Sequence, residues 1–248
     1  MKDDVIIVTG AASGVGKETA LLLAKDEAKV VCADIDEEGL EKLANTLDEL
    51  GLEGKTKVTD VAKAEAVEEL IDFTVETYGK LDGIFNNAGI RDGTHFDDVD
   101  PARYHEHLAV NQHSVFYGMH YAAKKMQALD TKNGRIVNTA SIRSYFGAEK
   151  SFRYSAAKAA IVSMTMSAAD ALAKDGIRVN AVAPAIIDTA LLAAVPEERI
   201  RRLEQKHLRK RLLKAIEVAK VVRFLFSEDS AAVNGATLLV DDGFLAVH

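Results

Sequence analysis

The stretch Val5-Ile6-Ile7-Val8-Thr9-Gly10-Ala11-Ala12-Ser13-Gly14-Val15-Gly16 decides the fold of this 248-residue chain. An apolar run typical of a buried strand leads into a glycine-rich turn, and a stretch typical of a helix follows at once. Glycines let the backbone turn sharply and approach a pyrophosphate closely, while the helix N-terminus offers free N–H groups to an anion. Although such a turn can simply connect a strand to a helix, its place at the first strand–helix junction favours a dinucleotide site. The residues expected to hold the cofactor here are Gly10, Ser13, Gly14, Val15 and Gly16.

A carboxylate at the end of the next strand-like run strengthens this interpretation. Asp34 closes the run Lys29–Asp34, where an acidic group can accept hydrogen bonds from the adenosine ribose hydroxyls. Asp34 and Asp36 would repel a 2′-phosphate, and the glycine-rich turn contains no lysine or arginine to neutralise it. The sequence therefore predicts NAD rather than NADP, with Ile35 beside the same site. Asp34 could also cap the helix that follows, and one role does not exclude the other.

Apolar runs of strand length alternate with longer amphipathic stretches from one end of the chain to the other. Buried strands interleaved with helices imply a parallel sheet with helices on both faces. The predicted fold is an α/β, Rossmann-type doubly wound domain with a seven-stranded parallel sheet. The seven expected strands are Val5–Thr9, Lys29–Asp34, Thr56–Thr59, Leu81–Asn86, Arg135–Ala140, Arg178–Ala183 and Ala236–Val240. The expected helices include Gly16–Lys25, Asp36–Leu50, Lys63–Tyr78, Pro101–Leu129 and Phe152–Lys174.

One segment interrupts this alternation. Pro196–Lys214 holds eight lysines or arginines against three glutamates. Such a charge run is usually a solvated helix face; the alternative is a substrate lid at about residues 188–214, in which Arg211 or Lys214 pairs with an anionic substrate group. Because the chain has only three prolines and no Gly/Ser-rich linker, residues 1–248 are expected to form a single domain.

Composition narrows the function classes. The net charge of −7 argues against a nucleic-acid-binding surface, which needs a basic field. The single cysteine, Cys32, rules out an internal disulfide framework, and the seven histidines form no metal-ligand spacing with carboxylates. Neither a membrane span of ~20 apolar residues nor a signal-peptide pattern is evident. We therefore expect a cytoplasmic protein that acts on a small molecule, with no metal and no nucleic-acid or membrane partner.

A tyrosine and a lysine spaced four apart are the clearest candidates for chemistry. Tyr154 and Lys158 lie in a stretch typical of a helix, so their side chains point the same way. A neighbouring ammonium favours ionisation of a phenol. Ser141 follows a separate strand and could share a substrate oxygen with that phenol. Such a pair alone is usually a packing contact, but here it also fits acid–base chemistry between a carbonyl and an alcohol.

Taken together, these motifs resemble the short-chain dehydrogenase/reductase family over essentially the whole chain. Two positions differ from the family pattern, since Ala185 and Asp242 stand where glycine is usual. The matching elements in chain order are Thr9–Gly16, Asp60-Val61, Asn86-Asn87-Ala88-Gly89, Asn111, Ser141, Tyr154-x-x-x-Lys158 and Arg178-Val179-Asn180-Ala181-Val182-Ala183-Pro184.

The resemblance implies a role for each matching residue. Tyr154 would be the general acid in reduction and the general base in oxidation, and Lys158 would lower the pKa of Tyr154 and hold the nicotinamide ribose. Ser141 would bind the substrate oxygen, and Asn111 would support a proton-relaying water chain. Further expected cofactor contacts are Asp60, Val61, Asn87, Ala88, Gly89, Tyr154, Lys158, Pro184, Ile187 and Thr189. The substrate candidates are Ser141, Arg143, Tyr154, Arg211 and Lys214.

The predicted activity is hydride transfer between NAD(H) and a small secondary alcohol or ketone. One form of this prediction is a substrate that carries a carboxylate or sulfonate group. Two alternatives stay open: an NADPH-linked ketone reductase and a non-catalytic NAD-sensing protein. The resemblance also implies a homo-oligomer, either a tetramer or a dimer. Its interfaces would be formed by Pro101–Leu129 and Phe152–Lys174, which are more apolar than one face of a monomer requires.

Overall fold

The computed structural model describes residues 1–91, 93–189, 192 and 195–247, and its main element is a seven-stranded parallel sheet. The strand order is β3-β2-β1-β4-β5-β6-β9. All seven expected strands are confirmed; two have the expected ends, and the ends of the others differ by at most two residues. Their bounds are β1 Val5–Thr9, β2 Lys29–Asp34, β3 Gly54–Val58, β4 Gly83–Asn86, β5 Gly134–Thr139, β6 Ile177–Pro184 and β9 Thr237–Val240.

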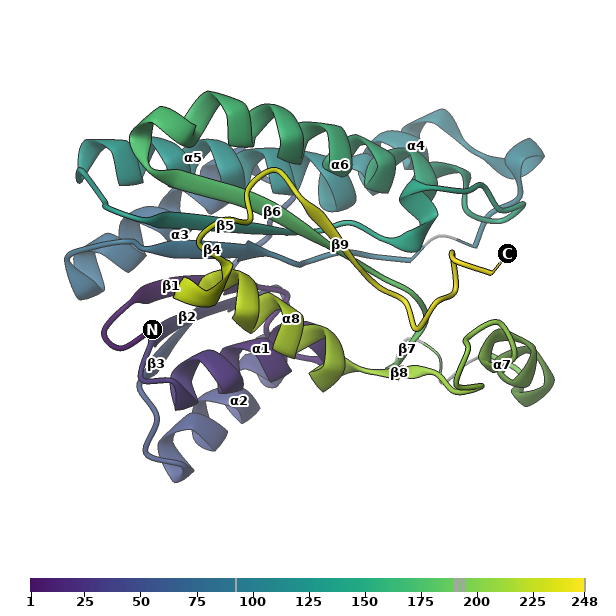
Figure 1. The fold of residues 1–248 in the computed structure, drawn as a ribbon, viewed down its shortest axis with the longest axis horizontal. Helices are drawn as coiled ribbons and strands as arrows, with labels where there is room; N and C mark the ends of the chain where they lie inside the picture. Colours follow the sequence, from purple (N-terminus) through teal and green to yellow (C-terminus); the bar gives the residue numbers. More distant parts are fainter. Residues whose placement is uncertain (92, 190–191, 193–194, 248) are drawn as a thin grey trace.

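Helices cover both faces of this sheet (Figure 1). On one face lie α1 (Gly14–Lys25), α2 (Glu37–Glu49) and α8 (Ala215–Phe226). On the other face lie α3 (Ala64–Tyr78), α4 (Pro101–Leu108), α5 (Ser114–Ala128) and α6 (Phe152–Leu172). The strand order reverses direction between β1 and β4, and in open α/β sheets the ligand binds at the carboxyl ends of the strands at such a point.

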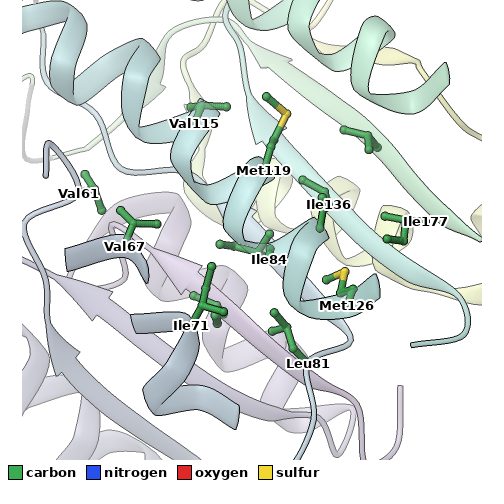
Figure 2. Close-up of a cluster of buried hydrophobic side chains, with 14 of the residues drawn as sticks. Val61, Val67, Ile71, Leu81, Ile84, Val115, Met119, Met126, Ile136 and Ile177 are labelled. Atoms are coloured by element: carbon green, nitrogen blue, oxygen red, sulfur yellow. The ribbon is translucent and has the colours of Figure 1, made fainter. Parts of the chain in front are cut away.

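Each face of the sheet has its own apolar cluster. Ile6 and Val8 of β1 belong to the cluster beneath α1, α2 and α8, whereas Ile7 belongs to the cluster beneath α3, α5 and α6. Figure 2 shows part of the second cluster, in which Ile71 of α3 and Met119 of α5 lie over the central strands. This alternation explains why the strands are apolar throughout, since both of their faces are covered.

The expected helix Pro101–Leu129 is interrupted in its middle. A π-helical turn, Ala109–His113, separates α4 from α5. The Asn111 side chain donates through Nδ2 to the carbonyl oxygen of His107 at 3.2 Å, and so competes for an acceptor that the α-helical ladder uses. The amphipathic pattern runs through this point without a break, which is why the sequence predicts a continuous helix. Single π-turns inside helices are frequent at functional sites.

A buried polar network holds the central strands to the helices behind the site. Asn86 Nδ2 donates to Asn138 Oδ1 at 2.9 Å, and Asn138 Nδ2 donates to Thr165 Oγ1 of α6 at 3.0 Å. A Cβ on Gly118 of α5 would lie only 1.9 Å from Asn86 Oδ1, so this close approach needs glycine. The network therefore fixes α5 and α6 against β4 and β5.

The basic run does not form one helix. It contains α7 (Glu197–Glu204), a set of turns, and the short strand β8 (Leu213–Lys214), which pairs in parallel with β7 (Ile187–Asp188). On α7 the exposed pairs Glu197–Arg201 and Glu198–Arg202 form a solvated charged face, as the first interpretation of this run expected. Residues 190–191 and 193–194 of the expected lid lie outside the described residues. Within the described ranges, no helix combines the length and the apolarity that a bilayer crossing requires.

Candidate active site

The glycine-rich turn joins β1 to α1 and leaves the start of α1 open to an anion. Gly10 (φ +66°) and Gly14 (φ +52°) adopt left-handed backbone that glycine tolerates best. A Cβ on Gly16 would lie 2.0 Å from the carbonyl oxygen of Gly10, so the turn closes this tightly only with glycine. Ser13 precedes α1, and among the described residues its side chain caps no helix N–H. The first-turn N–H groups thus suit a pyrophosphate.

Asp34 ties the end of β2 to this turn. Its Oδ2 accepts from the backbone N–H of Ala12 at 3.0 Å, and its Oδ1 accepts from that of Asp36 at 3.1 Å. Asp36, rather than Asp34, caps α2 by accepting from Gly39 N at 3.0 Å. The carboxylate of Asp34 therefore stands beside the glycine-rich turn, and the neighbouring Ile35 is 69% exposed.

The turn after β4 is fastened to the same place. Asn87 Nδ2 donates to the carbonyl oxygen of Thr9 at 3.0 Å. The Thr9 hydroxyl accepts from the backbone N–H groups of Asn87 at 2.9 Å and Ala88 at 3.1 Å. The strand ends on the two sides of the reversal in strand order are thus held together. Sequence reasoning gave Thr9 no role, although a hydroxyl ending an apolar strand was a usable signal.

Two further predicted cofactor positions have local partners. Asp60 accepts from the backbone N–H of Ala62 at 3.1 Å and pairs with Lys63 at 3.3 Å. Val61 is only 8% exposed and belongs to the apolar cluster beneath α3. Their contact with adenine stays a prediction.

The segment that follows β6 returns to the glycine-rich turn. β6 ends at Pro184, and Ile187 begins β7 while packing against the apolar cluster beneath α1. A Cβ on Gly14 would lie 3.6 Å from Thr189 Cγ2, so Thr189 faces the turn at van der Waals distance. The contacts of these three residues with a nicotinamide also stay predictions.

Tyr154 and Lys158 lie one turn apart on α6, as the spacing predicts. Lys158 Nζ is 5.6 Å from the centroid of the Tyr154 ring. The lysine is 2% exposed, and its Nζ donates to the carbonyl oxygen of Thr139 at 2.6 Å. Burial lowers the pKa of Lys158 from 10.5 to about 8. The ammonium is therefore fixed at the end of β5 in a poorly solvated position.

Tyr154 is half-buried, and several neighbouring groups act on the pKa of its phenol. Burial raises its pKa, whereas a hydrogen bond with Ser141 and the charges of Arg143 and Arg91 act in the opposite direction. These two arginines are cations that favour the phenolate. The Lys158 ammonium donates to the Thr139 carbonyl oxygen, and its effect on the pKa of Tyr154 stays a prediction.

Ser141 and Asn111 complete the group. Ser141 is 7% exposed, and its Oγ accepts from the backbone N–H of Arg143 at 3.1 Å. A Cβ on Gly89 would lie 2.8 Å from Asn111 Oδ1 and 3.9 Å from Lys158 Nζ, which places the amide and the ammonium around one glycine. The structure therefore brings all four predicted catalytic residues together.

A neighbouring serine that sequence reasoning missed fixes the two halves of this group. The Ser144 hydroxyl donates to the carbonyl oxygen of Lys158 at 2.7 Å, which joins the turn after Ser141 to α6. Serine is common in turns, so the sequence carried no specific signal for this contact.

Of the predicted substrate cations, only Arg143 lies at the group. Arg211 makes two short hydrogen bonds to the Glu217 carboxylate, at 2.6 and 2.7 Å. Lys214 stands at the start of α8, where its backbone N–H donates to the same carboxylate at 2.8 Å. Arg211 is thus paired inside its own segment, and the pairing of Arg211 or Lys214 with a substrate stays a prediction. By contrast, burial lowers the pKa of Arg143, while the charge of Tyr154 raises it and that of Arg199 lowers it.

The chain is similar to known oxidoreductases over almost its whole length. The family model described as enoyl-(acyl carrier protein) reductase matches residues 10–245. Cyclohexanol dehydrogenase from Acinetobacter sp. (strain SE19) is 37% identical over 241 residues, which cover 97% of this chain and 94% of that protein. Cis-4-hydroxycyclohexanecarboxylate dehydrogenase from Sinomonas cyclohexanicum is 38% identical over 244 residues, covering 98% and 97%. A crystal structure of a variant actinorhodin polyketide ketoreductase with NADPH matches with a TM-score of 0.92 at 31% identity, covering 98% and 99%.

Proposed function

The chain belongs to the short-chain dehydrogenase/reductase family, and from this premise we propose that it transfers a hydride between NAD(H) and a small secondary alcohol or its ketone. The relatives are alcohol and ketone oxidoreductases, so an oxidoreductase with a nicotinamide cofactor is the established part. The observation that supports the proposed reaction is the group formed by Ser141, Tyr154 and Lys158 at the carboxyl ends of the central strands.

The bound dinucleotide supplies the hydride chemistry, and the protein supplies orientation and proton transfer. The first-turn N–H groups of α1 would hold its pyrophosphate. Asp34 would bind the adenosine ribose, and Lys158 would bind the nicotinamide ribose. Ser141 would donate a hydrogen bond to the substrate oxygen. Because burial raises the pKa of Tyr154, its phenol is protonated at neutral pH and can donate a proton to a nascent alkoxide. In the reverse direction the Arg143 and Arg91 charges favour the phenolate that accepts this proton.

A wild-type assay tests the proposal directly. We expect absorbance of the reduced nicotinamide to rise when NAD and a panel of cyclic and linear secondary alcohols are added. It should fall when NADH and the matching ketones are added. Cofactor binding without turnover over the whole panel would contradict the proposal and support the NAD-sensing alternative.

The choice of NAD rests on the Asp34 carboxylate beside the glycine-rich turn. Because it would hydrogen-bond ribose hydroxyls and repel a 2′-phosphate, wild type should have the higher kcat/KM with NAD. Removing the charge in Asp34→Asn should lower kcat/KM for NAD by about 10–100-fold, as for the loss of a charged hydrogen bond. The same variant should gain or hold its kcat/KM for NADP. An NADP preference in wild type, or an unchanged ratio in Asp34→Asn, would favour the NADPH-linked alternative.

We propose that the alcohol or ketone carries an anionic group, which Arg143 binds. This arginine lies 4.5 Å over the Phe146 ring, and its charge acts on Tyr154. One relative is named for a hydroxycyclohexanecarboxylate. For that acid, Arg143→Ala should lower kcat/KM by about 10–100-fold, with a few-fold change for neutral cyclohexanol. Arg143→Lys should recover part of the loss. Equal losses on the acid and on cyclohexanol would contradict substrate pairing.

A homotetramer is the proposed assembly. Large apolar side chains are exposed on the two helices expected to form the interfaces, among them Phe116 of α5 (48%) and Phe152 and Met166 of α6 (43% and 52%). Burial of these side chains between identical subunits would remove apolar surface from water. Light scattering of the purified protein distinguishes a tetramer from a dimer. The cytoplasmic location and the single-domain organisation stay predictions.

A further inference from the structure

His107 is a buried titratable residue with no role in the mechanism above. It lies in the last turn of α4, immediately before the π-helical turn, and is 3% exposed. Histidine is more often partly exposed, and a buried imidazole needs hydrogen-bond partners. Its ring therefore has specific neighbours, and two of them belong to the proposed acid–base group.

The first neighbour is Asn111. Asn111 Nδ2 lies 3.3 Å from His107 Nδ1 and 3.2 Å from His107 Nε2. A neutral imidazole has one unprotonated nitrogen in either tautomer, so it can accept from this amide in both. Asn111 Nδ2 also donates to the His107 carbonyl oxygen at 3.2 Å, and Asn111 Oδ1 accepts from Ile90 N at 3.0 Å. His107 thus provides acceptors for the amide nitrogen while Ile90 fixes the amide oxygen.

The second neighbour is Tyr154. The two ring centroids are 6.3 Å apart with an interplanar angle of 77°, an edge-to-face arrangement. The Lys158 ammonium lies 5.6 Å from the centroid of the same Tyr154 ring. His107 therefore contacts both the phenol ring and the amide, and Lys158 lies close to the same phenol ring.

We propose that His107 is a positioning residue for the acid–base group, holding the Asn111 amide and the Tyr154 ring in register with Lys158. The proposal rests on the proposed function for its effect on catalysis. A purely apolar side chain at this position could pack against Tyr154, but it would leave an N–H of the buried amide without an acceptor. An unsatisfied buried donor is unfavourable, so its loss of an acceptor destabilises this arrangement or forces the amide to turn.

A pair of nearly isosteric substitutions separates hydrogen bonding from packing. His107→Gln keeps a strong acceptor on a flexible side chain, whereas His107→Met has similar length and offers only a weak one. We expect kcat to fall about tenfold or more in His107→Met and to stay within about threefold of wild type in His107→Gln. KM for the alcohol and for NAD should change little in either variant. The control is His105→Gln, on the same helix at an exposed position.

Side-chain hydrogen exchange of Asn111 gives a readout that does not need turnover. NMR of ¹⁵N-labelled protein should show slow exchange of the Asn111 amide protons in wild type and His107→Gln and faster exchange in His107→Met. The proposal is overturned if His107→Met keeps wild-type kcat and exchange, if both variants lose kcat equally, or if only KM changes. Wild-type protein that shows the expected exchange pattern but no redox turnover would instead contradict the proposed function.

Discussion

Tyr154→Phe lowers kcat for alcohol oxidation by about 10²–10⁴-fold, the usual contribution of a general acid–base group. Phenylalanine keeps the ring that packs edge-to-face against His107 and lies near the Lys158 ammonium. It removes only the hydroxyl that we propose exchanges a proton with the substrate oxygen. Because that hydroxyl is not needed to hold the pyrophosphate or the adenosine ribose, the Kd for NAD should stay within about threefold of wild type. Steady-state kinetics and a fluorescence titration with NADH measure the two quantities.

Tyr145→Phe is the matched control for this variant. Tyr145 lies in the turn after Ser141 and is 48% exposed, so the same chemical change there should leave kcat unaltered. Turnover by Tyr154→Phe within a few-fold of wild type would show that another group transfers the proton. Loss of NADH binding together with turnover would show that the substitution damaged the fold rather than the chemistry.

Lys158→Met removes turnover and at the same time changes how stability depends on pH. Lys158 has a folded-state pKa of about 8 because its ammonium is buried, against 10.5 for an ordinary lysine. Below about pH 8 the folded protein carries a charge that it solvates poorly, and stability is reduced. As pH rises from about 8 to about 10.5, the unfolded chain binds more protons than the folded one, so stability increases with pH.

The difference in the free energy of unfolding between wild type and Lys158→Met separates the contribution of Lys158 from that of the other titrating groups. The free energy of unfolding of wild type should rise relative to the variant by roughly 2 kcal/mol between about pH 7 and about pH 9.5. Urea denaturation at the two pH values measures it, with the exposed Lys124→Met as control. A pH-independent difference would mean that the ammonium is better solvated than the structure indicates.

Local patterns in the sequence were sufficient to predict the sheet and the glycine-rich turn. Runs such as Val5–Thr9 are apolar throughout because both faces of the strand are covered, and Gly10 and Gly16 are required by backbone geometry alone. The spacing of Tyr154 and Lys158 likewise fixed their common orientation, since one helical turn separates them. These features depend on residues that are close in the chain.

Features that depend on contacts of individual side chains could not be predicted in this way. The pKa of Tyr154 responds to burial, to Ser141 and Arg143, and to Arg91, which comes from the loop after β4. Arg211 pairs with Glu217 because the chain turns into β8 and α8 between them, and a charge run contains no signal for that turn. The π-helical turn at Asn111 depends on a side chain that competes with the backbone, which hydrophobic periodicity does not register.

Label transfer from a secondary alcohol deuterated at the carbinol carbon tests the central claim most directly. Wild-type protein should convert NAD and the deuterated panel alcohols into ketone and reduced nicotinamide. Mass spectrometry should find one deuterium in the reduced cofactor for each ketone formed, and almost none with Tyr154→Phe over the same time. Ketone formed without labelled cofactor, or wild-type protein that transfers no label from any alcohol of the panel, would contradict a hydride transfer assisted by this tyrosine.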